Sequence, residues 1–173
     1  MARQYFMDML AEPPLANLTA VTATSETALW SAATYTPIPA LDANRPGKAY
    51  MLKAGGIMSF ASTGSLTITP RAGLTVAANT LGASSARTSP GATTNQPWFM
   101  EMICVIRTTG TSGTMVATGG FQTNGTATLD VSASFGGTSA TFDTTVASGV
   151  TIGWTLSVAG TITPMFVTWQ AMN

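Results

Sequence analysis

The side chains that perform most protein chemistry are scarce in this chain. Its 173 residues include no His and a single Cys, Cys104, so Ser-His-Asp and Cys-His catalysis lack their base and a structural zinc site lacks ligands. Cys104 lies within the apolar run Met100–Ile106, where a small buried core residue is expected rather than a nucleophile. The sequence has no acidic run with the spacing of a calcium loop and no Gly-rich loop that ends in Lys-Ser or Lys-Thr. We therefore expect neither a metal nor a cofactor.

Paired carboxylates and exposed aromatic rings are the remaining chemistry that the composition allows. A glycosidase needs two carboxylates across one cleft, and no local cluster in the sequence suggests such a pair. The carboxylates are Asp8, Glu12, Glu26, Asp42, Glu101, Asp130 and Asp143. Trp rings can stack on sugars, but Trp98, Trp154 and Trp169 lie in apolar strand patterns, which favours packing in a core or between subunits. We predict that the protein is not an enzyme.

The charge content excludes further classes of partner. Charged residues make up 8% of the chain and the net charge is 0, whereas average proteins have about 25% charged residues. The cations are scattered, so no patch for nucleic acid or anionic lipid is expected. No run approaches the roughly 18 apolar residues that cross a bilayer, and Asp8 interrupts any signal-peptide core, so we expect synthesis in the cytoplasm. Because a nearly uncharged body tends to associate, we expect an obligate oligomer or a part of a larger assembly.

The clearest pattern lies in Gly136–Asn173, which reads as three strands joined by short turns. From Val150 to Val158 large apolar residues alternate with small or polar ones, the period of a strand with one buried face. Ile162–Ala171 is more apolar, and we expect it to pair centrally or with a neighbouring subunit because an exposed flat edge would recruit other chains. Strict alternation gives this strand one face with Met165, Val167, Trp169 and Ala171 and another with Pro164, Phe166 and Thr168.

The most apolar segment, Pro97–Arg107, is predicted to be a central strand or an interface strand because it is apolar on both faces. One face holds Trp98, Met100, Met102, Cys104 and Ile106, and the other holds Phe99, Glu101, Ile103, Val105 and Arg107. Weaker patterns predict further strands at Leu18–Ser31, Ala49–Ala61, Ser65–Pro70, Thr114–Phe121 and Thr126–Phe135. Loops are expected at Ala32–Lys48 and Arg71–Gln96, and turns at Gly110–Thr114 and Gly136–Ala140.

These strands, without a convincing interior helix, predict an all-β fold. Eight or nine strands at regular spacing fit a jelly-roll-like β-sandwich of about eight strands, in two packed sheets of four, over residues 18–173. The side chains predicted to pack in the core or between subunits are Trp98, Met100, Met102, Trp154, Phe166 and Trp169.

Residues 1–17 differ from the rest and are predicted to form an extended N-terminal docking arm. Pro13-Pro14 stops any helix, and the residues before it could form two turns at most. Disordered tails seldom carry so many apolar side chains, so docking on a partner is favoured over disorder and over folding back on the same domain. The side chains predicted to bind a partner are Tyr5, Phe6, Met7, Met9 and Leu10.

Two segments give the chain a resemblance to a known family. They are VIRTTGTSGT at Val105–Thr114 and TSATFDTT at Thr138–Thr145. With the strands around them, they resemble small jelly-roll structural proteins in the virions of tailed bacteriophages that infect actinobacteria. The resemblance covers about the C-terminal two thirds of the chain.

The resemblance implies a non-enzymatic virion component, made in the host cytoplasm, that forms homo-oligomers, often trimers. It leaves the head and the tail of the virion open. The N-terminal arm favours the head, as a capsid decoration protein that stabilises the shell by binding the major capsid protein. A tail protein that binds a receptor or a carbohydrate is the alternative. The expected partners are other copies of the chain and the major capsid protein or another virion protein, with no nucleic acid and no membrane.

Overall fold

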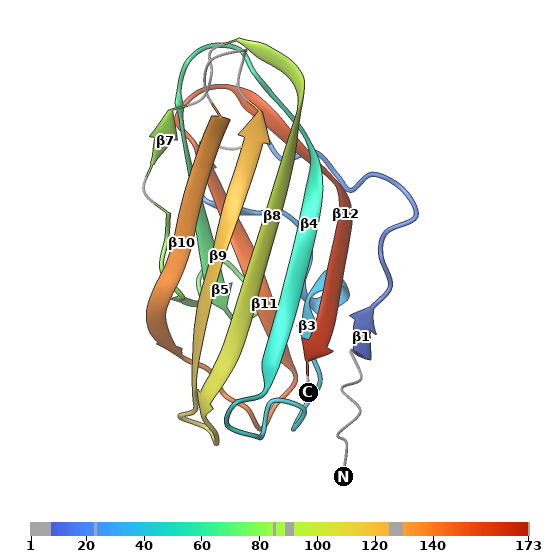
Figure 1. Ribbon diagram of the computed structural model, residues 1–173, viewed down its shortest axis with the longest axis vertical. Coiled ribbons are helices and arrows are strands. Elements are labelled where there is room, and N and C mark those ends of the chain that lie inside the picture. The colour runs from blue at the N-terminus through green and yellow to red at the C-terminus, as the bar shows by residue number, and fades with distance from the viewer. Residues whose placement is uncertain (1–7, 23, 85, 89–91, 125–129, 173) are drawn as a thin grey trace.

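Antiparallel strands that face each other in two layers make up this protein. The computed structural model describes residues 8–172 except 23, 85, 89–91 and 125–129 (Figure 1). Within these residues lie one short helix and twelve strands: β1 (Asp8–Ala11), β2 (Thr27–Ala28), α1 (Ala32–Tyr35), β3 (Pro37–Ile38), β4 (Ala49–Phe60), β5 (Ser65–Ala72), β6 (Asn79–Thr80), β7 (Arg87–Thr88), β8 (Thr93–Thr108), β9 (Thr114–Asn124), β10 (Asp130–Thr141), β11 (Ser148–Leu156) and β12 (Gly160–Met172).

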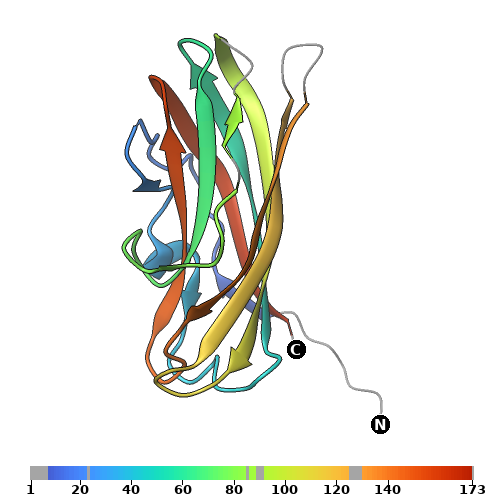
Figure 2. The same ribbon diagram turned by 90° about the vertical axis from the view of Figure 1, so that its left-hand side faces the viewer.

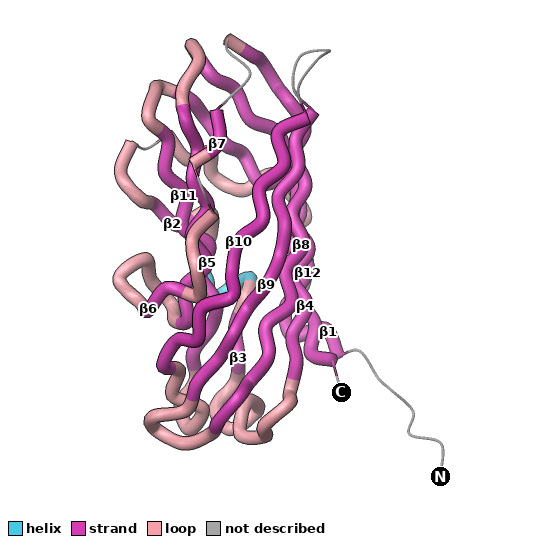
Figure 3. Tube along the Cα trace, turned by 60° about the vertical axis from the view of Figure 1, so that its left-hand side comes forward, coloured by secondary structure: helices cyan, strands magenta, loops and turns pink. Residues whose placement is uncertain are grey.

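The two sheets of the sandwich differ in size. We call the six-stranded sheet with the order β1-β12-β4-β8-β9-β10 the large sheet, and the sheet with the order β2-β11-β5-β6 the small sheet. In addition, β3 pairs with β11 and β7 pairs with β5. Figure 2 shows the two layers from the side, and Figure 3 traces the long strands of the large sheet along the molecule. The predicted all-β sandwich is confirmed, but the division is uneven because β2 and β6 are only two residues long.

Two strand pairs cross between the two sheets of the sandwich. β4 leads into β5 and β11 leads into β12, and each pair has one strand in either sheet. β4 lies against β12 in the large sheet while β5 lies against β11 in the small sheet. The strands β8, β9 and β10 then extend the large sheet as a simple meander. β12 is therefore paired on both sides, by β4 and by the short β1, as its apolar sequence predicts.

Aromatic rings form the centre of the core between the sheets. Trp169 stacks on Tyr50 with 5.4 Å between ring centroids, and Trp98 stacks on Phe121 at 5.9 Å. Trp154, from the small sheet, meets Phe121 edge-on at 5.2 Å. Such pairs add about 0.5–1.5 kcal/mol each beyond the burial of their surface. The ring contacts therefore join the two sheets directly.

The segment before α1 departs from the predicted strand Leu18–Ser31. β2 occupies only Thr27–Ala28, and Val21 makes an isolated bridge to Ile162. This segment runs along the open side of the sandwich. One side of it is partly buried, which explains its weak alternation, but it forms few backbone hydrogen bonds with neighbouring strands. The loop predicted at Ala32–Lys48 contains α1 and β3, each too short to give a periodic signal.

The Gly136-Gly137 pair, where composition predicts a turn, lies inside β10. Both residues have positive φ, 102° and 87°, and the register with β9 shifts between Gly136 and Ser139. A Cβ on Gly136 would lie 2.2 Å from the carbonyl oxygen of Ala117. The two glycines therefore form a β-bulge that bends a continuous strand.

The outer faces of the two sheets differ in what covers them. Over the small sheet, Thr151 Oγ1 donates to Gly73 O at 2.7 Å and Arg71 Nε donates to Glu26 Oε1 at 2.9 Å. Glu26 lies over Gly153, because a Cβ on that glycine would meet the Glu26 carboxylate at 2.0 Å. By contrast, no described segment passes over the outer face of the large sheet in Figure 1.

Trp169 is the core side chain whose loss we expect to cost most stability. It is fully buried, and its Nε1 donates to Pro37 O at 2.7 Å, which ties β12 to β3. We expect Trp169→Ala to lower the free energy of unfolding by about 3–5 kcal/mol. Trp169→Phe should lower it by less, because an aromatic ring stays and the hydrogen bond is lost. Urea denaturation followed by circular dichroism measures the free energy of unfolding of both variants. Equal losses would contradict the role of the buried aromatic ring at position 169.

Candidate functional site

Apolar side chains gather on the outer face of the large sheet, the side turned away from the core. Phe99 and Ile103 of β8 and Met165 and Phe166 of β12 are exposed there. Monomeric proteins rarely leave large continuous apolar patches in water, and such patches mark contact surfaces. We name the set the apolar face; it consists of Met51, Ile57, Phe99, Ile103, Val105, Val116, Met165, Phe166 and Met172.

Gly55 makes room for the aromatic part of the apolar face. It pairs with Phe99 of β8 and with Phe166 of β12, so the three form one row across the sheet. The two rings lie 6.5 Å apart between centroids. A Cβ on Gly55 would lie 2.5 Å from Cε1 of Phe166. The rings, which are 40% and 39% exposed, therefore use the space that a side chain at position 55 would fill.

A β-bulge in β12 adds Met165 to the apolar face. The register with β4 shifts between Pro164 and Phe166, which makes Met165 the extra residue. Strict alternation predicts Met165 inward and Pro164 outward, and the bulge reverses both: Pro164 is buried and Met165 is exposed. Beyond the bulge the alternation holds, with Phe166 outward and Trp169 inward.

A salt bridge crosses the middle of the apolar face. Lys53 of β4 and Glu101 of β8 are register partners, with 3.7 Å between Nζ and Oε2. Both side chains are accessible, at 41% and 46% of their surface, so the pair contributes about 1 kcal/mol or less to folding. The next pair along the same strands is Met51 with Ile103. The charged row is thus flanked by the Phe99 row on one side and by an aliphatic row on the other.

The residues predicted to pack in the core or between subunits are buried, with one exception. Trp98, Met100, Met102, Trp154 and Trp169 all lie in the core. Phe166 is instead part of the apolar face, so the core is not where it packs.

Three of the four exposed side chains of the apolar face, Phe99, Ile103 and Met165, are missing from the predicted packing set. Two of them have a signal in the sequence, since Pro97–Arg107 is apolar on both faces. β8 is central in its sheet, as predicted, but its second face is open rather than largely buried. Met165 had no such signal, because a bulge cannot be read from alternation.

The predicted N-terminal arm is described only from Asp8 onward. Tyr5, Phe6 and Met7 lie outside the described residues. Met9 and Leu10 belong to β1, which pairs with the end of β12. Met9 is exposed, whereas Leu10 packs against the core. The described part of the arm therefore includes a strand of the large sheet.

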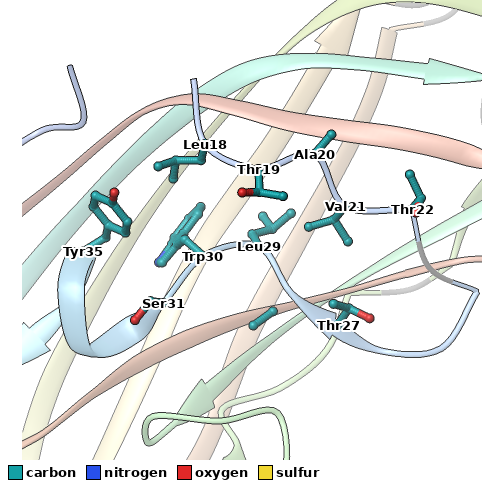
Figure 4. Close-up of a pocket in the computed structure, with 11 residues that line it drawn as sticks. Leu18, Thr19, Ala20, Val21, Thr22, Thr27, Leu29, Trp30, Ser31 and Tyr35 are labelled. Atoms are coloured by element: carbon teal, nitrogen blue, oxygen red, sulfur yellow. The ribbon is translucent and has the colours of Figure 1, made fainter. Parts of the chain in front are cut away.

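A groove opens along the side of the sandwich (Figure 4). Leu18 N donates to Pro164 O and Leu29 N donates to Ile152 O, each at 2.9 Å, so one wall borders the large sheet and the other borders the small sheet. The groove has a volume of about 670 Å³. Tyr35 and Trp30 lie toward one end of it and Thr22 toward the other (Figure 4). Its lining residues are Leu18, Thr19, Ala20, Val21, Thr22, Thr27, Ala28, Leu29, Trp30, Ser31 and Tyr35.

No Trp ring is exposed enough in this structure to stack on a sugar. Trp30 in the groove is only 6% exposed, and the other three Trp side chains lie in the core. The groove therefore presents mainly threonine, alanine and aliphatic side chains, together with Tyr35.

Cys104 and four of the seven carboxylates are engaged in the fold. Burial raises the pKa of the Cys104 thiol well above its usual range, so it stays protonated near neutral pH. Hydrogen bonds from Thr145 lower the pKa of the Asp143 carboxyl. Three other carboxylates form ion pairs, namely Glu26 with Arg71, Asp42 with Lys48 and Glu101 with Lys53.

Two other kinds of site are absent from the described part of the chain. No three His, Cys, Asp or Glu side chains there lie close enough together to hold a metal ion. The same residues include no helix that is long and apolar enough to span a membrane. The apolar face is therefore the strongest candidate site.

We expect Gly55→Ala to lower the free energy of unfolding by about 1–3 kcal/mol. The new Cβ would meet the Phe166 ring at 2.5 Å and Trp98 O at 2.9 Å. Gly120→Ala, in the same sheet, is the matched control, because its Cβ would come no closer than 3.8 Å to Ala133 O. Thermal denaturation compares the two. A Gly55→Ala variant as stable as the control would show that the rings do not need this space.

The two segments that carry the family resemblance meet at one end of the sandwich. Phe142 N donates to Gly113 O, and Gly110 N donates to Thr144 Oγ1, each at 2.8 Å. These two hydrogen bonds therefore join the β8–β9 turn to the loop after β10. Comparisons with family models, with curated proteins and with solved structures give no match to this chain. Membership of the phage family thus stays a prediction that rests on these two segments.

Proposed function

We propose that this protein is a non-enzymatic structural component of a bacteriophage virion, which works by packing the apolar face against another protein subunit. The observation that carries the proposal is the contrast between the two outer faces. The small sheet is covered by Glu26 and the loop at Gly73, whereas the large sheet leaves its apolar face open. The virion context comes from the resemblance of Val105–Thr114 and Thr138–Thr145 to phage proteins.

The apolar face can contribute binding free energy with little loss of conformational entropy. Complete burial of a Phe side chain stabilises by about 1.5–3 kcal/mol. Phe99 and Phe166 are about 40% exposed, so covering them would contribute roughly 1 kcal/mol each. The side chains stand on paired strands of a sheet, so little backbone entropy is lost when a partner covers them. This is the property expected of a subunit that contributes packing rather than catalysis.

Within the virion, we place the protein on the capsid as a decoration protein, a trimer by resemblance, anchored to the major capsid protein through its N-terminal arm. Asp8 pairs with Ala171 near the end of β12, so the described part of the arm begins at the rim of the large sheet. Binding the assembled shell but not the free capsid subunits would stabilise the shell by mass action. A tail position with receptor or carbohydrate binding is the alternative, and imaging of the particle with this subunit located distinguishes them.

The apolar face makes a direct prediction about solution mass. We expect the wild-type chain to sediment as a multiple of its 17.8 kDa mass. The variant Phe99→Ser/Phe166→Ser should shift toward the single-chain mass, because both exposed rings of the face are lost. Leu74→Ser is the control, since Leu74 is equally exposed, at 44%, but lies in the loop after β5. An oligomer unaffected by the double variant would exclude the apolar face as the contact surface.

The proposed arm predicts a separate effect on shell binding. Deletion of residues 1–7 leaves β1 and its pairing with β12 in place. We expect this deletion to reduce co-sedimentation with empty shells of the virion by tenfold or more, because the predicted anchors Tyr5, Phe6 and Met7 are removed. The oligomer mass and the unfolding curve serve as controls and should not change. Undiminished co-sedimentation would contradict the role of the arm.

A further inference from the structure

We propose that the partner of the apolar face is the same face of a second copy of this chain, packed about a two-fold axis that runs parallel to the strands between β4 and β8. The inference rests on the proposed function and names the partner for that surface. In such an arrangement each residue of β4 lies opposite its own β8 register partner on the other copy. Whether the apolar face is complementary to itself therefore depends on which residues are register partners across the sheet.

The charged row is complementary under this two-fold axis. Lys53 and Glu101 are register partners on β4 and β8, and both are accessible on the outer face. The axis places Lys53 of one copy opposite Glu101 of the other, and the reverse. The four charges then alternate in sign around a square, with each cation beside two carboxylates. Opposite charges in register favour this orientation over one shifted by a row, which would leave charges against aromatic or aliphatic side chains.

The apolar rows are complementary under the same axis. Met51 lies opposite Ile103 of the second copy, because the two are register partners in one chain. Phe99 lies opposite Gly55, over which the Phe166 ring of that other copy lies, so aromatic rings of the two copies meet there. Each copy thus sets its Phe99 ring opposite Gly55, one of the two glycines of β4. Packed sheets commonly cross at about −30°. Such a crossing angle displaces opposing residues little near the axis and more with distance from it.

The next row continues the match toward the end of the sheet. Ala49 of β4 pairs with Val105 of β8, which in turn pairs with Val116 of β9. On the other side of β4, Ala49 pairs with Met172 of β12. The axis sets β12 of one copy against β9 of the other, so Met172 lies opposite Val116. In this row apolar side chains therefore meet apolar side chains on both sides of the axis, whereas in the Phe99 row Phe166 lies opposite Gln122 of the second copy.

The area of the face suits a stable pair. The five long strands of the large sheet have 11 to 16 residues each. The apolar face lies on four of these strands, β4, β8, β9 and β12. With strands about 4.8 Å apart and about 3.3 Å of rise per residue, eleven residues on four strands cover roughly 700 Å². A standard specific interface buries about 800 Å² on each partner. A second copy can therefore cover the apolar face almost completely.

The pairing has a consequence for the number of copies. A contact in which the same surface meets itself closes after two subunits. The assembly then contains an even number of chains, which is two for a free pair, or six if the trimers implied by the family resemblance meet through their apolar faces. A measured odd number of copies would contradict the pairing.

Complementary charge variants test the pairing directly. Lys53→Glu makes the charged row entirely acidic, and Glu101→Lys makes it entirely basic. Under the proposed axis each variant repels its own copies, and we expect the dissociation constant of each to rise at least about tenfold. An equimolar mixture of the two should recover the association, as complexes with one copy of each variant. The double variant Lys53→Glu/Glu101→Lys keeps opposite charges in register and should associate as the wild type does.

Analytical ultracentrifugation measures the association, and native mass spectrometry with one variant isotopically labelled identifies the mixed complexes. Circular dichroism of each variant checks that it is folded. Recovery in the mixture supports the pairing, because a contact within one chain cannot be restored by adding another chain. If the wild type is oligomeric and sensitive to Phe99→Ser/Phe166→Ser, but the mixture stays dissociated, the pairing is wrong and the proposed function stands. A monomeric wild type overturns the pairing.

Discussion

The aromatic contact between the two sheets is the interaction on which the rest of this structure depends. Tyr50, Trp98 and Trp169 all turn inward from the large sheet. Successive side chains of a strand point to opposite faces, so this choice fixes which residues turn outward. Phe99 and Met51 therefore turn outward, because each is the next residue in the sequence after a buried aromatic residue. The apolar face is therefore the reverse side of the strands that build the core, and any change in register would alter both together.

Much of the fold could be predicted because each long strand has one face in the core. The alternation at Val150–Val158 corresponds to β11, and the apolar run Pro97–Arg107 lies within β8. Five of the six predicted packing residues lie in the core for the same reason. The sequence also indicates that β8 is apolar on both sides. It cannot show whether another layer of the same chain or another molecule covers the second side, because both give the same pattern.

The parts that could not be predicted are those where local geometry departs from alternation. The Gly136-Gly137 pair has the composition of a turn, yet positive φ at both residues serves a bulge in β10 equally well. Met165 turns outward because β12 contains one extra residue against β4. The row of Phe99, Gly55 and Phe166 joins three strands that are distant in the sequence, so its members could be named only once the register was known.

The pairing of β12 with β4 also bears on how quickly this protein can reach its native state. Trp169 lies beside Leu52, and Trp154 lies beside Ile68, so the central ladders join distant parts of the chain. The loop-closure entropy of such contacts must be overcome before they contribute any energy. Sandwiches with this high contact order fold in milliseconds to seconds, far more slowly than helical proteins of similar stability. Completion of the central ladders, rather than diffusion to a partner, is therefore expected to limit how soon a newly made chain becomes competent for assembly.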